Sequence, residues 1–244
     1  MKNYVAIFSL CVFTTTFFSC NRDAPNTLSD QEIKDGWVLL FDGTTTDSWQ
    51  SCKTNHFPDS GWKVENGELI VLGNGGDIIT KELYSNFDLK VDFKLTPQAN
   101  SGVKYFVADY SDTAGKSHFP LGLEFQILDD VLHPDARLGS HEGSRTIASL
   151  YDLIKAENKK PAPVGEWNHG EIISNGSHVE HWLNGTKVVE YERGSAEFKK
   201  LVSESKYKDY VNFGEAPEGY ILLQDHGDTV HYRNIKIKKL EVKK

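Results

Sequence analysis

The sequence predicts an all-β protein whose antiparallel strands form a sandwich, and three observations support this fold class. Short segments alternate apolar and polar residues at a period of two, the pattern of a half-buried strand. Asn-Gly and Asp-Gly turns separate several of these segments, and helical periodicity is almost absent. The 13 Phe, 10 Tyr and 5 Trp residues add strand propensity. Many short strands with turn signals between them favour two packed sheets.

Residues 1–19 are expected to be a lipoprotein signal peptide. Lys2 supplies a positive charge, and the apolar run from Tyr4 to Phe18 is shorter than a membrane-spanning helix. A small residue directly precedes Cys20, as in a bacterial lipoprotein cleavage box. We therefore expect Cys20 to carry a lipid anchor, with a plain secretory signal as the alternative. Residues 20–35 then form a polar tether, in which Ser29-Asp-Gln-Glu32 has the spacing of a helix capping box.

Length, charge and cysteine content limit the domain number, the partners and the chemistry that the chain can have. The chain has 244 residues without an internal repeat or a clear boundary, so residues 36–244 are expected to form one domain. The net charge of −8, with no basic cluster before the last few residues, argues against nucleic acid as a partner. With Cys20 as the anchor, Cys52 has no disulfide partner and is expected to be structural rather than nucleophilic.

The predicted elements of the first half follow in order. Gly36–Gly43 is the first strand, and Trp62–Leu72 is a hairpin with Asn66-Gly67 at a type I′ turn. In Phe87–Leu95, the odd-numbered apolar residues are expected to face the core and the charged residues to face water. In Val103–Val107, the odd-numbered residues are likewise expected to share one face.

The second half begins with the strand Gly122–Asp130 and a long loop over residues 129–146. Loops of this length are usually functional or disordered, and the His and acidic residues of this one favour the rim of a site over a linker. Residues 149–154 form a short apolar element. Two Asn-Gly turns nine residues apart predict a three-stranded meander over residues 167–191. Residues 194–219 are polar and are expected to carry a short surface helix. Residues 219–228 and 229–242 are expected to form a final hairpin.

Two of these strands carry polar residues of an unusual kind on one face, where an ordinary solvent-facing strand would carry Lys, Thr or Ser. Glu124 and Gln126 share one face of the strand Gly122–Asp130, opposite the apolar face, and Gln224 and His226 share a face near the C-terminus. A carboxylate and an amide at mid-strand can form the floor of a polar site, although an exposed Glu on a sheet face is the simpler alternative. His is the usual acid–base residue near neutral pH.

A conventional two-carboxylate mechanism is one hypothesis for this face. Glu124, Gln126 and Asp129 look like the Glu-x-Asp-x-x-Glu signature of jelly-roll glucanases. Retaining glycosidases need two carboxyl groups about 5–5.5 Å apart. Glu124 and Asp129 have opposite strand parity, so only a bulge would direct both into one site. Gln126 cannot act as an acid or a base, which also argues against this mechanism.

The chain resembles the 3-keto-disaccharide hydrolase domain family over nearly all of its mature length. The resemblance rests on Gly36-Trp-Val-Leu-Leu-Phe-Asp-Gly43, Asn100-Ser-Gly102, Glu124-Phe-Gln-Ile-Leu-Asp129, Ser149-Leu-Tyr-Asp152, Gly165-Glu-Trp-Asn168, His181-Trp-Leu-Asn-Gly185, Leu223-Gln-Asp-His-Gly227 and Arg233-Asn-Ile235. It implies a concanavalin A-like jelly roll and a lipoprotein of a Bacteroidetes-type cell envelope, facing the periplasm or the outer membrane. The membrane contact would be the lipid anchor alone.

The resemblance also implies an activity, the net hydrolysis of glycosides whose C3 carries a ketone. This route needs one base, one donor to the enolate oxygen and one acid. Glu124 and His226 are the predicted catalytic residues, as base or acid. The predicted substrate-binding residues are Gln126, Asp129, Tyr151, Asp152, Gln224, Arg233, Lys104 and His133.

Arg233 poses a problem of parity within this set. In strict alternation it would share the buried face of Ile235 and Ile237. A bulge near Asn234, or a buried pairing of Arg233, would resolve this.

The alternative to an enzyme is a non-catalytic, lectin-like carbohydrate-binding module, because one fold can serve many functions. Such a module would display exposed aromatic residues, and Trp49, Trp167 and Trp182 are its candidates. No metal ligands are predicted, because the His and acidic residues of the 129–146 loop lack a zinc spacing. No cofactor is identified, and a requirement for a divalent metal stays open.

Overall fold

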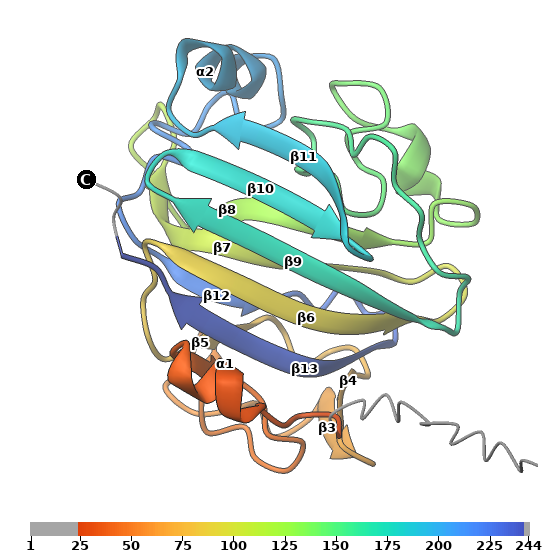
Figure 1. Ribbon diagram of the computed structural model, residues 1–244. Coiled ribbons are helices and arrows are strands. Elements are labelled where there is room, and N and C mark those ends of the chain that lie inside the picture. The colour runs from red at the N-terminus through yellow and green to blue at the C-terminus, as the bar shows by residue number, and fades with distance from the viewer. Residues whose placement is uncertain (1–23, 242–244) are drawn as a thin grey trace, which may run out of the picture.

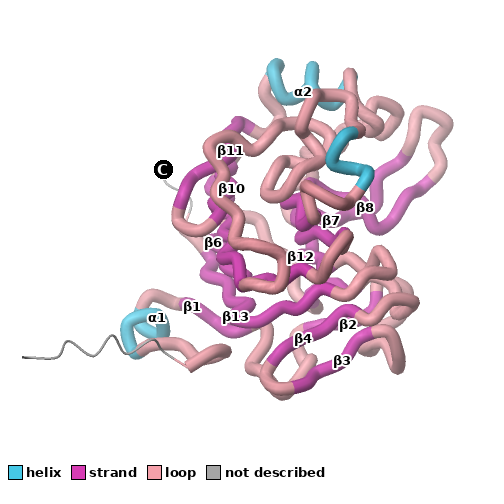
Figure 2. The backbone as a smooth tube through the Cα atoms, turned by 90° about the vertical axis from the view of Figure 1, so that its right-hand side faces the viewer, coloured by secondary structure: helices cyan, strands magenta, loops and turns pink. Residues whose placement is uncertain are grey.

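The computed structural model describes residues 24–241 as two antiparallel β-sheets packed face to face (Figure 1). Seen from the side, β7, β8 and β12 lie in one layer and β6, β10 and β11 in the other (Figure 2). The apolar core fills the space between the layers and includes Phe93 of one sheet and Phe125 of the other, whose rings meet edge to face. The predicted all-β sandwich is confirmed.

The larger sheet has eight strands. In spatial order these are β11 (Thr186–Glu192), β10 (His178–Leu183), β9 (Trp167–Asn175), β6 (Phe87–Leu95), β13 (Val230–Lys239), β4 (Glu68–Val71) and β3 (Trp62–Glu65), with β1 (Trp37–Leu39) paired to β13. The smaller sheet has five strands, in the order β2 (Trp49–Ser51), β5 (Ile78–Thr80), β12 (Tyr220–Leu223), β7 (Asn100–Ser111) and β8 (Ser117–Leu128). The helical elements are α1 (Asp30–Lys34), the 3₁₀ turn η1 (Pro134–Arg137) and α2 (Ala196–Ser203).

Local signals predicted several elements correctly. The hairpin β3–β4 turns at Asn66 and Gly67, which have φ values of 53° and 76° as a type I′ turn requires. The β9–β10–β11 meander is confirmed, and α1 begins with the capping box of Ser29 and Glu32. The expected surface helix is α2. These features depend on residues close together in the chain, so the sequence alone specifies them.

Two strand faces differ from the prediction. Asp88 and Asp92 of β6, expected to face water, are 9% and 7% exposed, because side chains of neighbouring strands cover them. In β7, Phe106 has a φ of 51° and the register shifts beside it. This irregularity turns Phe106 into the main core and moves Val107 into a small apolar cluster with Ile79 and Leu222.

The expected final hairpin is wrong. β12 belongs to the five-stranded sheet and β13 to the eight-stranded sheet, so the chain crosses between layers over residues 224–229. A register shift between Arg233 and Lys236, with Asn234 at a φ of 50°, is the bulge that parity required. Arg233 therefore points outward from β13 on the far side of the sandwich.

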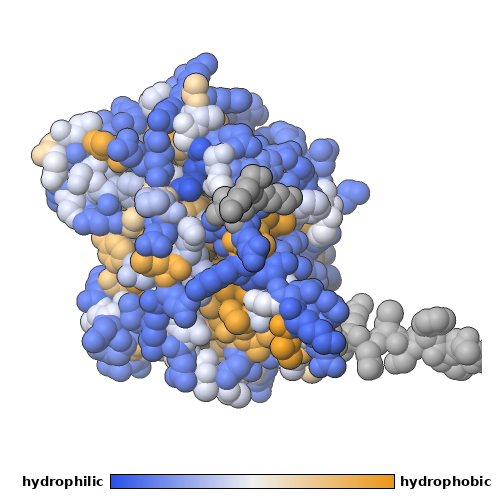
Figure 3. All heavy atoms as spheres, turned by 60° about the vertical axis from the view of Figure 1, so that its left-hand side comes forward, coloured by the Kyte–Doolittle hydropathy of each residue, from blue (hydrophilic) through white to orange (hydrophobic). Residues whose placement is uncertain are grey.

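On the face seen in Figure 3, the surface is mainly hydrophilic, with apolar side chains gathered in patches. Among residues 24–241, no helix has the length and apolar character needed to cross a membrane. The predicted signal peptide and Cys20 lie outside the described residues.

Candidate active site

Two cross-strand rows bring the predicted polar residues together on the outer face of the five-stranded sheet. In the first row, Lys104 of β7 lies opposite Leu222 of β12 and opposite Glu124 of β8. The Tyr151 backbone N–H donates to the Glu124 carbonyl oxygen at 3.0 Å, which adds the 149–151 segment beyond β8. Because directly opposite residues point to the same face, Lys104 and Glu124 are side by side.

The second row holds the two glutamines. Gly102 of β7 lies opposite Gln126 of β8, and the Gln224 backbone N–H donates to the Gly102 carbonyl oxygen at 3.1 Å. Glu124 reaches into this row, because a Cβ added at Gly102 would lie 2.6 Å from Glu124 Oε1. The missing side chain of Gly102 thus provides the space in which the carboxyl group sits between the two glutamines.

The Glu124 carboxyl group is nearly buried, with 4% of the residue exposed. Burial raises its pKa, although the positive charges of Lys104, Lys206 and His226 oppose this, and Asp77 adds to the rise. Lys104 Nζ lies 3.9 Å from Glu124 Oε2, at the limit of an ion pair. The Glu124 carboxylate is therefore a stronger base than that of an ordinary glutamate, and perturbed groups of this kind cluster at functional sites.

Lys206 also lies among the residues around Glu124, and the sequence analysis did not predict this. It lies in the segment after α2 that was interpreted as polar surface. Its ammonium nitrogen lies 4.1 Å from the centroid of the Tyr151 ring and 5.1 Å from that of Tyr207. The residue as a whole is exposed. Its ammonium group lies among protein atoms, and this local burial, with the charges of Lys104 and Arg145, lowers the pKa of Lys206. No local motif marks such a lysine.

Asp152 holds Lys206 in place rather than lining the site. It is fully buried, and its carboxylate accepts hydrogen bonds from Arg145 Nε at 2.7 Å, from the Lys206 N–H at 2.9 Å and from the Ser140 N–H at 3.0 Å. Burial alone would raise the pKa of Asp152, but these donors hold it below its ordinary value. The predicted substrate-binding carboxylate is thus already occupied by the protein.

Asp152→Asn is expected to lower the free energy of unfolding by about 1.5–3 kcal/mol, because it weakens hydrogen bonds made to a buried charge. Asn tolerates the positive φ of 62° at this position, so the backbone should not add to the loss. Urea denaturation of the variant and the wild type measures the difference. Asp59→Asn, at an exposed aspartate, is the matched control; equal midpoints for all three proteins would contradict the expectation.

His226 lies just past the end of β12 and is exposed. Asp225 anchors this turn, since its Oδ2 accepts from the Gly75 and Gly76 N–H groups at 2.7 and 2.8 Å. Asp228 Oδ2 accepts from the Asn100 N–H at 3.0 Å. These aspartates shape the turn that carries His226, whose charge acts on Glu124.

Asp129 and His133 follow the end of β8, and both side chains accept hydrogen bonds from backbone N–H groups. Asp129 accepts from the Gln98, Val131 and Leu132 N–H groups at 2.9, 3.0 and 3.1 Å, and these donors lower its pKa in spite of burial. His133 Nδ1 accepts from the Asp135 N–H at 3.1 Å and caps η1. Asp129 is therefore not the second carboxylate of a glycosidase pair with Glu124.

Arg233 lies away from Glu124, so its predicted place in the substrate-binding site is wrong. Its guanidinium stacks 3.9 Å from the Trp167 ring centroid, and its Nε donates to Asp92 Oδ2 at 3.4 Å. Both partners belong to the eight-stranded sheet. The whole apolar core lies between Arg233 and Glu124.

Three buried amide atoms beside Glu124 have no hydrogen-bond partner among the described residues. They are Gln126 Nε2, Gln224 Oε1 and Asn100 Oδ1. Asn100, Gly102 and Lys104 are alternate residues of β7, so the side chains of Asn100 and Lys104 share the outer face. A buried polar atom that stays unpaired costs about 1–3 kcal/mol, so such atoms point to a ligand.

No flat aromatic platform is formed by the three predicted tryptophans. Trp49 is completely buried, Trp167 lies beneath Arg233, and the Trp182 indole N–H donates to Glu180 at 2.7 Å. A hollow of about 790 Å³ lies between α2 and β11, and Glu124 is not among the residues that line it. Titratable side chains with shifted pKa values mark a functional site better than the size of a hollow does, because chemistry requires reactive groups.

Cys52 packs against the small apolar cluster of Ile79 and Leu222. Burial, with the nearby charge of Asp77, raises the pKa of the Cys52 thiol to about 12. The thiolate needed for nucleophilic attack is therefore scarce at neutral pH.

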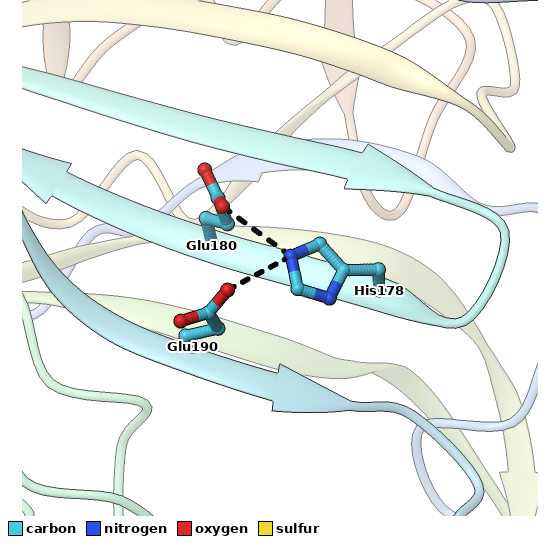
Figure 4. Close-up of side chains that lie close together, drawn as sticks. All are labelled: His178, Glu180 and Glu190. Atoms are coloured by element: carbon cyan, nitrogen blue, oxygen red, sulfur yellow. Dashed lines mark hydrogen bonds and ion pairs between the residues drawn. The ribbon is translucent and has the colours of Figure 1, made fainter.

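Within the described part of the chain, one cluster has the spacing of metal ligands, and it lies on the other sheet. His178 Nε2 lies 3.3 Å from Glu180 and 3.2 Å from Glu190 (Figure 4). Lys187 Nζ, at 3.2 and 2.7 Å from the same two glutamates, already supplies a countercharge. The His and acidic residues of the 129–146 loop do not form such a cluster.

Comparison with known proteins adds a family to this geometry. A family model described as a 3-keto-alpha-glucoside-1,2-lyase-like domain matches residues 36–238. A 3-keto-disaccharide hydrolase of Bacteroides thetaiotaomicron is 34% identical over 232 residues, which cover 85% of this chain and 79% of the relative.

Two crystal structures from Parabacteroides distasonis, each described as a candidate glycosyl hydrolase, are also similar. The first has 31% identity and a TM-score of 0.77, and the alignment covers 89% of this chain and 100% of that one. The second has 29% identity and a TM-score of 0.66, with 84% and 99% covered.

Proposed function

The chain belongs to the 3-keto-alpha-glucoside-1,2-lyase-like domain family, and we propose that it cleaves the glycosidic bond of 3-keto-glycosides with the side chains around Glu124. The family resemblance noted in the sequence is thereby confirmed. The observation that carries the proposal is the nearly buried Glu124 carboxyl group with a raised pKa, placed beside Lys104. Such a group suits acid–base chemistry near neutral pH.

The reaction has a simple physical logic. A ketone at C3 of the sugar acidifies the proton on C2, so one base can remove it. The C1 substituent then leaves by β-elimination, and water adds to complete a net hydrolysis. No matched pair of carboxylates is needed, which agrees with the engagement of Asp129 by backbone N–H groups.

Roles follow from the charges of the site. Glu124 is the base for the C2 proton, because a raised pKa gives its carboxylate more basic strength. Lys104, whose Nζ lies 3.9 Å from Glu124 Oε2, supplies positive charge where negative charge develops in the transition state. His226, exposed at the edge of the group, is the acid for the leaving oxygen.

The unpaired amide atoms support a hydroxyl-bearing substrate. A sugar hydroxyl can donate to Gln224 Oε1 and Asn100 Oδ1 and accept from Gln126 Nε2. The end torsion of an amide side chain is broad, so these atoms can turn toward a ligand at little cost.

Gln224→Met is expected to raise KM for a 3-keto-glucoside by about 3- to 10-fold, the value of one hydrogen bond. Initial-rate kinetics over a range of substrate concentrations measure this change. Gln31→Met, on the exposed face of α1, is the control and should leave KM unaltered. A KM for Gln224→Met equal to that of the wild type would remove Gln224 from the substrate site.

The decisive test compares chromogenic 3-keto-glucoside with the unoxidised glucoside. We expect release of the chromophore from the 3-keto substrate only. Release from the unoxidised glucoside alone would support an ordinary glycosidase. Binding of both sugars without cleavage of either would support the lectin-like alternative.

We also propose that Cys20 carries a lipid and holds the protein in the cell envelope, facing the periplasm or the outer membrane. The support is the small residue before Cys20 at the end of the apolar N-terminal run. Metabolic labelling with palmitate should mark the wild type and not Cys20→Ser. An unlabelled wild-type protein would refute the anchor.

A further inference from the structure

We propose that Lys206 forms a covalent imine with the C3 ketone of the substrate. The inference rests on the proposed function, because only a carbonyl substrate can react in this way. It concerns a residue for which the sequence analysis assigned no role.

The first support is the position of the amine. Unlike Lys104, Lys206 has no carboxylate oxygen within 4.0 Å of its nitrogen among the described residues. Its nitrogen lies instead against the rings of Tyr151 and Tyr207, at 4.1 and 5.1 Å from their centroids. The backbone N–H of Lys206 is held by the buried Asp152 at 2.9 Å, so the start of the side chain is fixed.

The second support is the charge around the amine. An imine requires the neutral amine as nucleophile, and lysines reach that state when desolvated or placed beside other cations. Burial is the main influence that lowers the pKa of Lys206, and the charges of Lys104 and Arg145 act in the same direction. Glu124 and Asp152 act the other way, and aromatic rings favour a cation. The net shift is downward.

The third support is the partner base. Glu124 is close enough for its charge to act on Lys206, and Lys206 acts in turn on Glu124. The ketone carbon and the C2 proton are on adjacent atoms of the sugar. One residue can therefore activate C3 while the other removes the proton from C2.

The chemistry balances without an added reagent. The Lys206 nitrogen attacks C3, and one water leaves to give a protonated imine. Glu124 takes the C2 proton, the electrons form an enamine, and the C1–O bond breaks as the leaving oxygen takes a proton. One water adds across C1 and C2, and a second water hydrolyses the imine, which releases the 3-keto sugar and restores the free lysine. The net consumption is one water.

The test is reductive trapping. Wild-type protein that has been incubated with a 3-keto-glucoside is treated with cyanoborohydride, which reduces an imine to a stable secondary amine. Peptide mass spectrometry should find the sugar adduct on Lys206, and activity should be lost irreversibly. The unoxidised glucoside is the control substrate and should leave no adduct.

Variants separate a covalent role from an electrostatic one. Lys206→Arg keeps the positive charge but cannot form the imine, so it should lose turnover as completely as Lys206→Met. Lys208→Arg, at an exposed neighbouring lysine, should retain wild-type turnover and trapping. Circular dichroism establishes that each variant is folded, and trapping of the wild type needs no variant at all.

The outcomes are distinguishable from a failure of the proposed function. Turnover of the 3-keto-glucoside without any adduct, or with Lys206→Arg active, would overturn the imine and leave the hydrolase function standing. An adduct on Lys104 instead would overturn the assignment to Lys206. Absence of turnover in the wild type would overturn both proposals.

Discussion

Glu124→Gln is expected to lower kcat on a 3-keto-glucoside by about 10²–10⁴-fold, the usual contribution of a positioned general base. Gln keeps the shape of the side chain and its place above Gly102, but it cannot accept the C2 proton. KM should change little, because the substitution removes an interaction made in the transition state. Steady-state kinetics at several pH values provide the measurement.

The matched control is Glu166→Gln, at an exposed glutamate on the approach to β9. It makes the same chemical change far from the site and should leave kcat unaltered. If Glu124→Gln turned over the 3-keto substrate at the wild-type rate, Glu124 would have no part in the chemistry. The base would then have to be sought elsewhere on this face, with His226 as the first candidate.

The same substitution is expected to change how stability depends on pH. The Glu124 pKa is raised in the folded protein, so the native state holds the proton more tightly than the unfolded chain does. The protonated carboxyl group thereby adds to the free energy of unfolding. This stabilisation is fully present below the unfolded-state pKa of about 4.3 and is lost as pH rises through the pKa of the folded state. Relative to the wild type, Glu124→Gln should therefore gain stability from pH 4 upward. A Tm difference that stayed constant with pH would contradict this.

Gly102→Ala is expected to reduce kcat by about 100-fold while leaving the fold intact. The new Cβ would lie 2.6 Å from Glu124 Oε1 and 3.0 Å from its carboxyl carbon, so the carboxyl group must move. A displacement of about 1 Å at a reacting group can cost two orders of magnitude in rate. Kinetics with the 3-keto-glucoside and circular dichroism together check both halves of the prediction.

Gly170→Ala is the control for this substitution, since it also places Ala within a strand. Its Cβ would meet Phe125, Phe93 and Val91 at 3.3–3.4 Å, inside the core and away from the Glu124 carboxyl group. It should cost stability through tight packing and leave kcat close to that of the wild type. Equal kcat for Gly102→Ala and the wild type would show that the carboxyl position is not critical.

Strand parity explains why much of the site could be predicted. Glu124, Gln126 and Gln224 were assigned to polar strand faces from alternation alone, and the register of β7, β8 and β12 places those faces together. Alternation is a local property of the backbone, so it can be recognised in the sequence before the fold is known. Parity also argued against a Glu124–Asp129 pair, and the Asp129 carboxylate accepts its hydrogen bonds from backbone N–H groups.

Long-range features could not be predicted in the same way. Arg233 was misplaced because residues 224–229 pass from one sheet to the other, which no turn signal reveals. Lys206 was missed because its surroundings come from Tyr151 and Asp152, more than fifty residues earlier in the chain. Asp152 was predicted to bind substrate, but its buried carboxylate accepts hydrogen bonds from Arg145, Ser140 and the Lys206 N–H and so holds these segments together.

The sequence by itself determined the all-β class, the hairpin and meander turns, the family and the polar strand faces that carry Glu124 and the two glutamines. These depend on periodicity, on residues with positive φ and on short motifs, all of which act over a few residues. Only the tertiary structure decided which faces meet, which carboxylates are occupied by the backbone and which lysine stands beside Glu124. Such contacts depend on sheet order and on burial, because pKa shifts and unpaired polar atoms arise only when distant segments exclude water together.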